Sequence, residues 1–409
     1  MHLVLDLLLA LAAFVGHFSL AVWLYNRLHA LAGPVWLLKT LERLVLLLAA
    51  AVLVVYLGRS LWTGDVAPPT SGAGLAYAAL CWMAAVLVIP LWLVPKLRER
   101  EPAALLANDT QVIDIAQRLG RRPVQGASAR FFAALPGNEI FRLHVHRKTL
   151  HLPGLPAELD GLRIAHLSDL HMIGHVTEDF YGEVVDTTNA LEPDLICLTG
   201  DILEKHGCFP WIPRTLGRLQ APHGKFFILG NHELRLGNVA PLREALTAAG
   251  LTDLGSRYET LSINGANVLL AGNELPWFGT SPSLPSAERG TRNAERDVHS
   301  DSSQLRTPRS EFRILLSHTP DQLPWARARG FDLVLAGHNH GGQIRLPWLG
   351  ALISPSWYGW RYAGGLYHEP PTVLHVSRGI AAKHPIRLNC PPELALLVLR
   401  RSRSGYTGC

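Results

Sequence analysis

The chain has 409 residues, 48% of them hydrophobic and 17% charged, which is long for one domain and apolar for a soluble protein. Its formal charge of +5 is small for this length and comes without a long Lys/Arg run, so the composition argues against a nucleic-acid-binding protein. The five cysteines are scattered without a CxxC spacing, which argues against a disulfide framework or a thiolate zinc site. Small buried side chains and a free C-terminal thiol are expected instead.

The hydrophobic excess is concentrated in residues 1–97, which we predict to form a transmembrane anchor of about three spans. Residues 7–25 and 75–94 each reach the roughly 20 residues needed to cross a bilayer. Residues 44–57 are fewer and cross only if the flanking Arg43 and Arg59 extend their charges to the head groups. The alternative is a signal peptide followed by buried helices, but the opening MHLVLD has no Lys or Arg.

Basic residues predict the orientation of this anchor. They flank the first connection and follow the third apolar segment: Arg27, Lys39, Arg43, Lys96, Arg98 and Arg100. The second connection has only Arg59 beside Asp65. The positive-inside rule therefore predicts a multi-pass protein of the inner (cytoplasmic) membrane whose later residues face the cytoplasm. His17, inside the first span, is expected to pack against a neighbouring helix.

Residues 98–160 are predicted to be a linker and the beginning of the soluble domain. Residues 102–120 have helical spacing, and residues 139–156 alternate like a strand. His144 and His146 lie on one face of the alternating run, without a strand-end glycine or an acidic partner nearby. We therefore expect both histidines to be solvated strand residues rather than ligands.

From residue 162 onward, short apolar runs repeatedly end in a tight polar cluster, usually beside a glycine. The clusters are SDLH, TGD, GNHE, SH and GHNHGGQ, which contain Asp169, His171, Asp201, Asn231, His232, Glu233, His318, His338 and His340. Such runs are typical of strands buried on both faces, and helical stretches at 178–190 and 239–249 intervene. The carboxyl ends of strands in α/β folds are where ligands usually bind.

These clusters supply nitrogen and oxygen donors, more than one metal ion needs. Two cations about 3.5–4 Å apart, bridged by a carboxylate, are an arrangement that cleaves phosphate esters. Taken singly, each cluster is more often a structural turn, because Gly-Asp and Gly-Asn are common turn dipeptides. The ordered set of five is what favours a metal site.

In this order the motifs resemble the calcineurin-like metallophosphoesterase superfamily. The resemblance covers about residues 162–400, including the tail VSRGI and PIRLNCPPELALLVL, and is closest to a membrane-linked branch similar to a UDP-diacylglucosamine pyrophosphatase. It implies a four-layer αββα sandwich over residues 161–402 with a dimetal site at the sheet edge. The runs NVLLAG, QIRLP, TVLHVSRG and LALLVLR are expected in a second sheet.

The resemblance also implies roles for the site residues. The first divalent metal would be held by Asp169, His171 and His340, and the second by Asn231, His318 and His338. Asp201 would bridge both ions, which could be Mn, Fe, Zn or Mg. His232 would protonate the leaving oxygen and help to hold the phosphate, a role that suits the pKa of an imidazole. Glycines beside the motifs, including Gly230 and Gly337, would let the backbone pass close to the ions.

Three features depart from the motif pattern or lie outside it. Asn339 replaces the usual Thr and is expected to point away from the ions. AGNELPW, at 271–277, replaces a more acidic turn, which leaves substrate contacts there open. Residues 280–310 are polar and rich in Ser and Arg, and are predicted to be a mobile surface insertion near the active-site side.

The sequence thus predicts a membrane-anchored, dinuclear metal-dependent phosphohydrolase that cleaves a phosphoester or pyrophosphate bond. The anchor favours a lipid-linked substrate over a soluble phosphorylated small molecule, and no nucleic acid is expected. Two alternatives remain open. One is a membrane-associated nuclease or phosphodiesterase of the same superfamily, and the other is a non-catalytic metal-binding membrane scaffold.

Overall fold

The computed structural model describes residues 2–31, 33–69, 71–97, 102–152, 154–285 and 311–401. The chain forms two compact units. The first unit comprises residues 1–101 and 352–361, and the second unit comprises residues 102–351 and 362–409. Of the predicted insertion, residues 286–310 lie outside the described residues.

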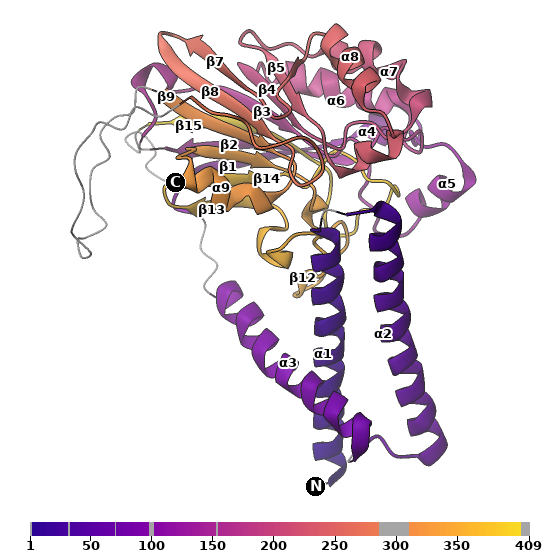
Figure 1. Cartoon of the computed structure of the whole chain (residues 1–409). Coiled ribbons are helices and arrows are strands. Elements are labelled where there is room, and N and C mark those ends of the chain that lie inside the picture. Colours follow the sequence, from indigo (N-terminus) through magenta and orange to yellow (C-terminus); the bar gives the residue numbers. More distant parts are fainter. Residues whose placement is uncertain are drawn as a thin grey trace, which may run out of the picture. The chain divides into compact units, whose positions relative to one another are not determined.

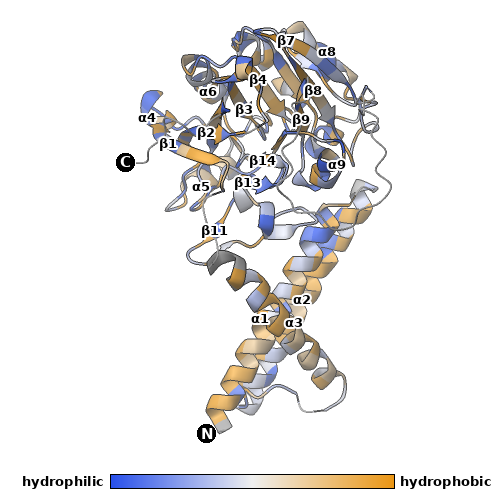
Figure 2. Ribbon diagram, turned by 90° about the vertical axis from the view of Figure 1, so that its left-hand side faces the viewer, coloured by the Kyte–Doolittle hydropathy of each residue, from blue (hydrophilic) through white to orange (hydrophobic). Residues whose placement is uncertain are grey.

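The first unit contains three long helices: α1 (His2–His29), α2 (Val35–Thr63) and α3 (Gly72–Leu97). Each is long and apolar enough to cross a membrane, as the sequence predicted. Apolar residues line the three helices in Figure 2. The second helix, with 29 residues, is much longer than the apolar run at 44–57, because the flanking residues continue the helix on both sides.

Polar contacts join the three helices. His17 of α1 bonds to the Tyr77 hydroxyl of α3 at 2.7 Å and to the Ala49 carbonyl of α2 at 3.1 Å. This confirms that His17 packs against neighbouring helices. The indole of Trp82 donates to the carbonyl of Leu9 at 2.9 Å. Such bonds satisfy polar groups that lipid cannot.

The second unit contains two large β-sheets (Figure 1). The first sheet has seven strands in the order β1 (Leu105–Asp114), β2 (Arg142–His151), β15 (Glu393–Arg400), β3 (Arg163–Leu167), β4 (Leu195–Thr199), β5 (Lys225–Ile228) and β6 (Thr252–Asp253). The second sheet has six, in the order β13 (Gly365–Glu369), β14 (Thr372–Val376), β10 (Leu333–Ala336), β9 (Glu311–Ser317), β8 (Ala266–Asn273) and β7 (Tyr258–Ile263). A separate hairpin consists of β11 (Arg345–Leu346) and β12 (Gly350–Ala351).

Helices cover the sheets and complete a layered α/β sandwich. The outer face of the first sheet packs against α6 (Glu178–Ala190), α7 (Trp211–Arg214) and α8 (Ala240–Ala248) in one apolar core. A second core fills the space between the two sheets with strand residues such as Ile164, Phe226 and Ile314. On the second sheet, α9 (Leu323–Ala328) lies against β14. The short helices α4 (Ile115–Arg118) and α5 (Ala127–Ala133) precede β2. The predicted fold class is confirmed.

Three local predictions were wrong. Residues 105–114 form an edge strand rather than a helix, because they pair antiparallel with β2 along their length. The run LALLVLR is β15, which lies in the first sheet between β2 and β3 and not in the second. The run QIRLP contributes to the separate β11–β12 hairpin.

His146 also differs from its prediction. It is buried and bonds to the Thr110 hydroxyl at 2.8 Å and to the Arg378 guanidinium at 2.6 Å. Burial lowers its pKa to about 3, so the ring is neutral at physiological pH. Arg378 comes from 232 residues further along the chain, which is why the sequence showed no partner nearby.

Four cysteines, Cys81, Cys197, Cys208 and Cys390, are free and buried, as expected for small core side chains. Cys409 lies outside the described residues.

Candidate metal centre

The first candidate donor set comes from loops that follow β3, β4 and β10. The nearest donor atoms of Asp169, His171, Asp201 and His340 all lie within 4.8 Å of one another. The Nε2 atoms of His171 and His340 are 3.0 Å apart. Asp169 Oδ1 is 3.4 Å from His340 Nε2. This set matches the residues assigned to the first metal plus the bridging Asp201.

The second donor set follows β5, β9 and β10. His318 Nε2 lies 3.1 Å from Asn231 Oδ1 and 3.4 Å from Asp201 Oδ2. The ring of His338 meets that of His318 edge to face, with centroids 5.0 Å apart. All seven candidate ligands therefore converge from five strand ends. Loops of both sheets contribute, because β3, β4 and β5 run parallel in one sheet and β9 and β10 in the other.

The backbone of the site is held in an unusual conformation. Five candidate ligands have positive φ: Asp169, His171, Asp201, His338 and His340. Non-glycine residues rarely adopt this region, and such strain clusters at functional sites. These residues lie just after strand ends, where the chain turns out of the sheet.

Two glycines let the loops approach this closely. A Cβ on Gly230 would lie 2.4 Å from Asp201 Oδ1, and one on Gly337 would lie 2.6 Å from Asp169 Oδ2. Any side chain at either position would displace a candidate ligand. The prediction that these glycines allow close passage of the backbone agrees with this geometry.

The pKa values of several candidate ligands are shifted from their usual values. Burial raises the pKa of Asp169, and the Asp201 charge adds to this effect. Burial opposes ionisation of Asp201 as well, but His318 and His232 hold its pKa well below the usual range. Burial and the neighbouring His171 hold the pKa of His340 well below its usual value, so this imidazole is neutral. Nitrogen and oxygen donors that face one another around ionised carboxylates fit divalent cations.

Glu204 is a site residue that sequence reasoning missed. Its carboxylate accepts from His171 Nδ1, lies 2.8 Å from His232 Nδ1 and pairs with Arg235. A carboxylate on the far nitrogen of a metal-binding imidazole fixes the ring's orientation and tautomer. The only signal in the sequence was an acidic residue three positions after Asp201, which no spacing rule singles out.

Arg387 lies in the tail motif PIRLNCPPELALLVL, and no role was predicted for it from the sequence. Its guanidinium is completely buried and donates to the carbonyl of His340 at 3.1 Å. It also donates to the carbonyls of Arg378 and Ala381. The conformation of the GHNHGGQ loop therefore depends on a residue 47 positions further along.

Glu233 has a structural role in the GNHE turn. Its buried carboxylate accepts from the backbone N–H groups of Gly230 at 2.7 Å, Asp201 at 3.1 Å and Leu203 at 3.1 Å, and also from Ile202. One side chain thus joins the loop after β4 to the loop after β5. The prediction that Glu233 orients the turn agrees with these contacts.

The structure shows what Asn339 and the turn AGNELPW, the two departures from the motif pattern, contact. Asn339 is buried and donates to the carbonyl of Tyr362 at 2.7 Å, so it points away from the ligands. In the turn AGNELPW, Glu274 accepts from Leu229 N–H at 2.6 Å and pairs with Arg243. Trp277 of the same turn places its ring 4.9 Å from that of His338 and 5.4 Å from that of His318. An aromatic ring therefore lies beside two candidate ligands, in a turn that was expected to be more acidic.

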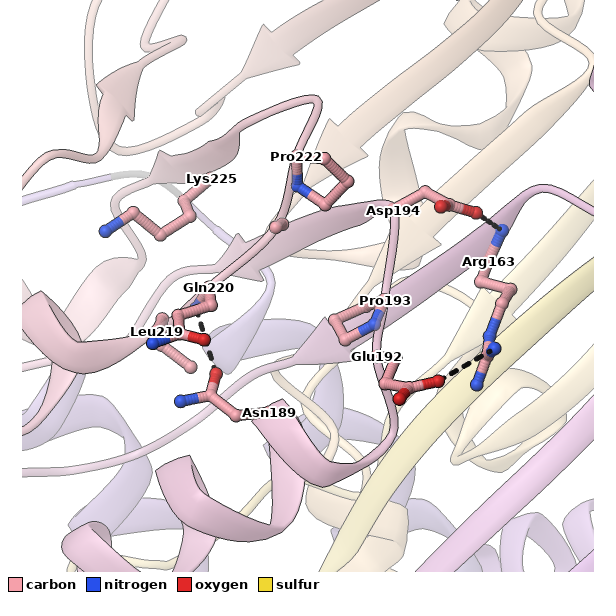
Figure 3. Close-up of a pocket in the computed structure, with 10 residues that line it drawn as sticks. Arg163, Asn189, Glu192, Pro193, Asp194, Leu219, Gln220, Pro222 and Lys225 are labelled. Carbon is pink, nitrogen blue, oxygen red and sulfur yellow. Dashed lines mark hydrogen bonds and ion pairs between the residues drawn. The ribbon is translucent and has the colours of Figure 1, made fainter.

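A cavity of about 710 Å³ lies away from these ligands, at the amino ends of β3, β4 and β5 (Figure 3). Its polar side chains are engaged with neighbours: Asp194 accepts from the backbone of Arg163 at 2.8 Å, and Asn189 accepts from that of Gln220 at 2.9 Å. Ligands in α/β folds bind at the opposite, carboxyl ends of strands. We therefore assign the chemistry to the metal centre and not to this cavity.

The sequence is similar to known proteins over the region that contains the metal centre. The model of the calcineurin-like phosphoesterase family matches residues 162–342, a range that holds every candidate ligand. The uncharacterized metallophosphoesterase YkuE of Bacillus subtilis is 33% identical over 252 residues, which are 60% of this chain and 82% of that protein. The chain belongs to the calcineurin-like phosphoesterase family. It is a hydrolase of the phosphoesterase type, and this family binds divalent metals.

Two other relatives in this family have informative names. The UDP-2,3-diacylglucosamine pyrophosphatase LpxG of Chlamydia trachomatis is 28% identical over 310 residues, covering 62% of this chain and 88% of that protein. A bovine transmembrane protein with metallophosphoesterase domain is 28% identical over 354 residues, covering 81% of this chain and 69% of that protein. The predicted membership of a metallophosphoesterase family with membrane-linked and pyrophosphatase members is confirmed.

Proposed function

We propose that this protein is a membrane-anchored phosphohydrolase that uses two divalent metals to cleave the pyrophosphate or phosphoester bond of a lipid-linked substrate. The position of Asp201 carries the proposal. Its Oδ2 atom lies 3.6 Å from His171 Nε2 of the first donor set and 3.4 Å from His318 Nε2 of the second. One carboxylate oxygen shared by two sets of donors is the arrangement that a pair of ions requires.

The assignment of ligands follows the two sets. Asp169, His171 and His340 would hold one ion, Asn231, His318 and His338 would hold the other, and Asp201 would bridge them. When bound, the two ions supply an acidified water and neutralise charge on the phosphate. The chain itself orients the ligands through Glu204, Glu233 and Arg387.

His232 is the proposed general acid. Its side chain is partly exposed, unlike those of His171 and His318, and its Nε2 lies 3.9 Å from Asp201 Oδ2. Glu204 Oε1 lies 2.8 Å from its Nδ1, which leaves Nε2 to hold a proton toward the leaving oxygen. A histidine in contact with a carboxylate on one nitrogen and with substrate on the other suits this role.

The anchor supports a substrate in the membrane. All three helices of the first unit are long and apolar enough to cross it. The chain leaves the first unit after α3 and re-enters it at Leu352, whose carbonyl accepts from Asn26 near the end of α1. The ends of α1 and α3 must then lie on the same side, which requires α2 to cross. The basic residues that flank these ends, together with their shared side, support a catalytic domain in the cytoplasm.

The substrate proposal is tested with the purified full chain in lipid nanodiscs. Hydrolysis of a UDP-linked diacylated sugar, soluble nucleotides, single-stranded DNA and a chromogenic phosphodiester is compared with added manganese. We expect the lipid-linked pyrophosphate to have the highest kcat/KM, and Asp201→Asn to serve as the blank.

Two results would contradict the proposal. Preference for DNA, with cleavage that falls steeply as salt rises, would favour a membrane nuclease. Equal, negligible turnover of the wild type and Asp201→Asn on every substrate would favour a metal-binding scaffold.

A further inference from the structure

The loop that follows the GHNHGGQ motif exposes a group of apolar side chains. Between residues 344 and 353, in the sequence IRLPWLGALI, the exposed ones are Ile344, Leu346, Trp348, Leu349, Leu352 and Ile353. Trp348 stands at the tip of the β11–β12 hairpin with 90% of its surface exposed. The hairpin lies beyond the two large sheets (Figure 1). Clustered exposed apolar residues mark an interaction surface.

The base of this hairpin is fixed to the metal centre. Leu388 donates its N–H to the carbonyl of Gln343 at 3.1 Å and accepts from Arg345 N–H at 2.9 Å. Its neighbour Arg387 donates to the carbonyl of the candidate ligand His340. The hairpin and the last metal-ligand loop therefore form one rigid piece, so whatever the tip binds also fixes the position of the metal centre.

The other end of the hairpin continues directly into the first unit. Asn26, in the last turn of α1, donates to the carbonyl of Leu352 at 3.2 Å and accepts from Ser354 N–H at 3.0 Å. The guanidinium of Arg27 lies 4.7 Å from the ring centre of Trp357. The segment after the hairpin is thus held at one end of a helix long enough to cross a membrane.

The length of the chain limits where the hairpin tip can be. A helix of 28 residues is about 42 Å long and exceeds a hydrocarbon core of about 30 Å, so its last turn lies among the lipid head groups. Trp348 is four residues from Leu352, and four residues span at most about 14 Å. The tip must then lie at or near the bilayer surface.

The composition of this stretch matches that of the membrane–water interface. Tryptophan and tyrosine with basic residues are enriched there, and residues 344–361 contain Arg345, Trp348, Trp357, Tyr358, Trp360 and Arg361. Protein interfaces favour the same residue types, but the neighbouring end of α1 belongs to a helix long enough to cross a membrane. Lipid is therefore the occupant that the contacts favour.

We propose that the β11–β12 hairpin inserts Trp348 into the head-group region of the bilayer and forms a second membrane attachment for the catalytic domain. The first attachment is the connection after α3. Two attachments, one of them rigidly joined to the ligand loop, hold the metal centre at a constant distance from the membrane. The inference rests on the proposed crossing of α1 and is independent of the reaction.

The test is a fluorescence measurement on the full chain in nanodiscs of phosphatidylethanolamine and phosphatidylglycerol. Single cysteines introduced by Trp348→Cys, Val55→Cys and Tyr258→Cys, each in a Cys409→Ser background, are labelled with an environment-sensitive nitrobenzoxadiazole dye. The background protein alone measures residual labelling of the buried native cysteines. Position 55 lies in α2, and position 258 lies on β7 at the far edge of the second sheet.

We expect the dye at position 348 to emit at shorter wavelength and to be quenched several-fold more by nitroxide-labelled lipid than by aqueous iodide. The dye at position 258 should show the reverse. Iodide quenching at 348 together with lipid quenching at 55 would overturn the inference while leaving the anchor intact. Protection of position 348 from both quenchers would also overturn it, because a protein would then cover the tip. Loss of lipid quenching at 55 would instead refute the anchor.

Discussion

Two buried clusters in the second unit combine histidine rings with carboxylates, and a comparison of their charges separates their roles. One is the metal centre. The other lies among the strands and consists of the buried Lys148, His166, His375 and Glu393 and the partly exposed Arg378. Glu393 lies 2.6 Å from Lys148 Nζ and 3.3 Å from Arg378 Nε, so its charge is compensated by two cations of the chain. We call this second group the lysine cluster.

The carboxylates of the metal centre have different partners. Among the described residues, the ion-pair partners of Asp169 and Asp201 are histidines. Only Glu204, at the margin, pairs with an arginine. Asp169 and Asp201 thus pair with histidines rather than with permanently charged side chains, and metal ions would supply their countercharge.

The pKa values of two equally buried histidines, His318 of the metal centre and His375 of the lysine cluster, shift in opposite directions. Burial alone would lower the pKa of His318, but Asp201 and Asp169 raise it to about 9. Burial and the Lys148 charge lower the pKa of His375 to about 4. The same side chain, equally buried, thus attracts a positive charge in one cluster and is a neutral hydrogen-bonding group in the other. What distinguishes a metal site from a structural polar cluster is whether the chain supplies its own cations.

The largest effect is expected from a substitution in the metal centre. Asp201→Asn keeps the shape of the side chain but removes the shared charge, so we expect the loss of at least one bound metal and a fall in kcat of about 100-fold or more. The midpoint of unfolding of the metal-free protein should also decrease, because the buried His318 loses the carboxylate that raises its pKa. Metal analysis and turnover measure the first effects, and a thiol-reactive dye that reports exposure of the buried cysteines measures unfolding. Full turnover in this variant would refute the assignment.

The second largest effect is expected from a substitution in the lysine cluster. Glu393→Gln leaves Lys148 buried without a countercharge, and we expect it to destabilise the folded state by about 3–5 kcal/mol, or roughly 6–20 °C in the midpoint. Metal content should stay unchanged. Lys148→Met combined with Glu393→Gln should recover part of the loss. If Glu393→Gln instead lost metal at unchanged stability, the two clusters would not be separable.

A smaller effect concerns the orientation of ligands. Glu204→Gln removes the negative charge beside the Nδ1 atoms of His171 and His232 and places an amide NH2 toward Arg235. We expect about 10–100-fold weaker metal binding, with a matching fall in turnover at limiting metal. A manganese titration of activity measures this change. Glu178→Gln is the control, because it breaks only an exposed ion pair with Arg214, and such pairs contribute little to stability. Equal titrations for the two variants would show that Glu204 has no orienting role.

The smallest effect is a pH dependence of stability. Burial opposes ionisation of Glu393, but Lys148 and Arg378 hold its pKa well below the usual range. A lowered folded-state pKa gives stability that is complete above the unfolded-state value of about 4.3 and is lost as the pH falls further. Metal-free wild type should therefore lose up to about 1.4 kcal/mol per pH unit more than Glu393→Gln below that value. Parallel pH profiles of the two proteins would argue against an ionised Glu393.

The sequence alone was sufficient to predict the candidate ligands and the three apolar helices. Asp169, His171 and Asp201 each follow a buried strand within two to four residues, so a local pattern predicts that they lie at a strand end. Helix α6 was predicted with the bounds that the structure has, since its amphipathic repeat is local. The length of an apolar run is likewise a local property.

The sequence did not predict which distant residues contact the candidate ligands or which strands pair. Glu204 contacts His171 from 33 positions away, and Arg387 contacts His340 from 47. The strand at 105–114 has helical spacing, and only its pairing with β2 makes it a strand. Similarly, β15 is buried on both faces, so its composition says that it is central but not in which sheet.

The sequence by itself thus determined which residues carry metal-binding chemistry and which segments can cross a membrane, because both depend on residue type and short spacing. The tertiary structure decided which charges meet. It gave Glu393 its lysine and arginine, left Asp201 between histidines, and joined the exposed hairpin to the ligand loop. Such pairings depend on how distant segments pack, and a local pattern does not encode that.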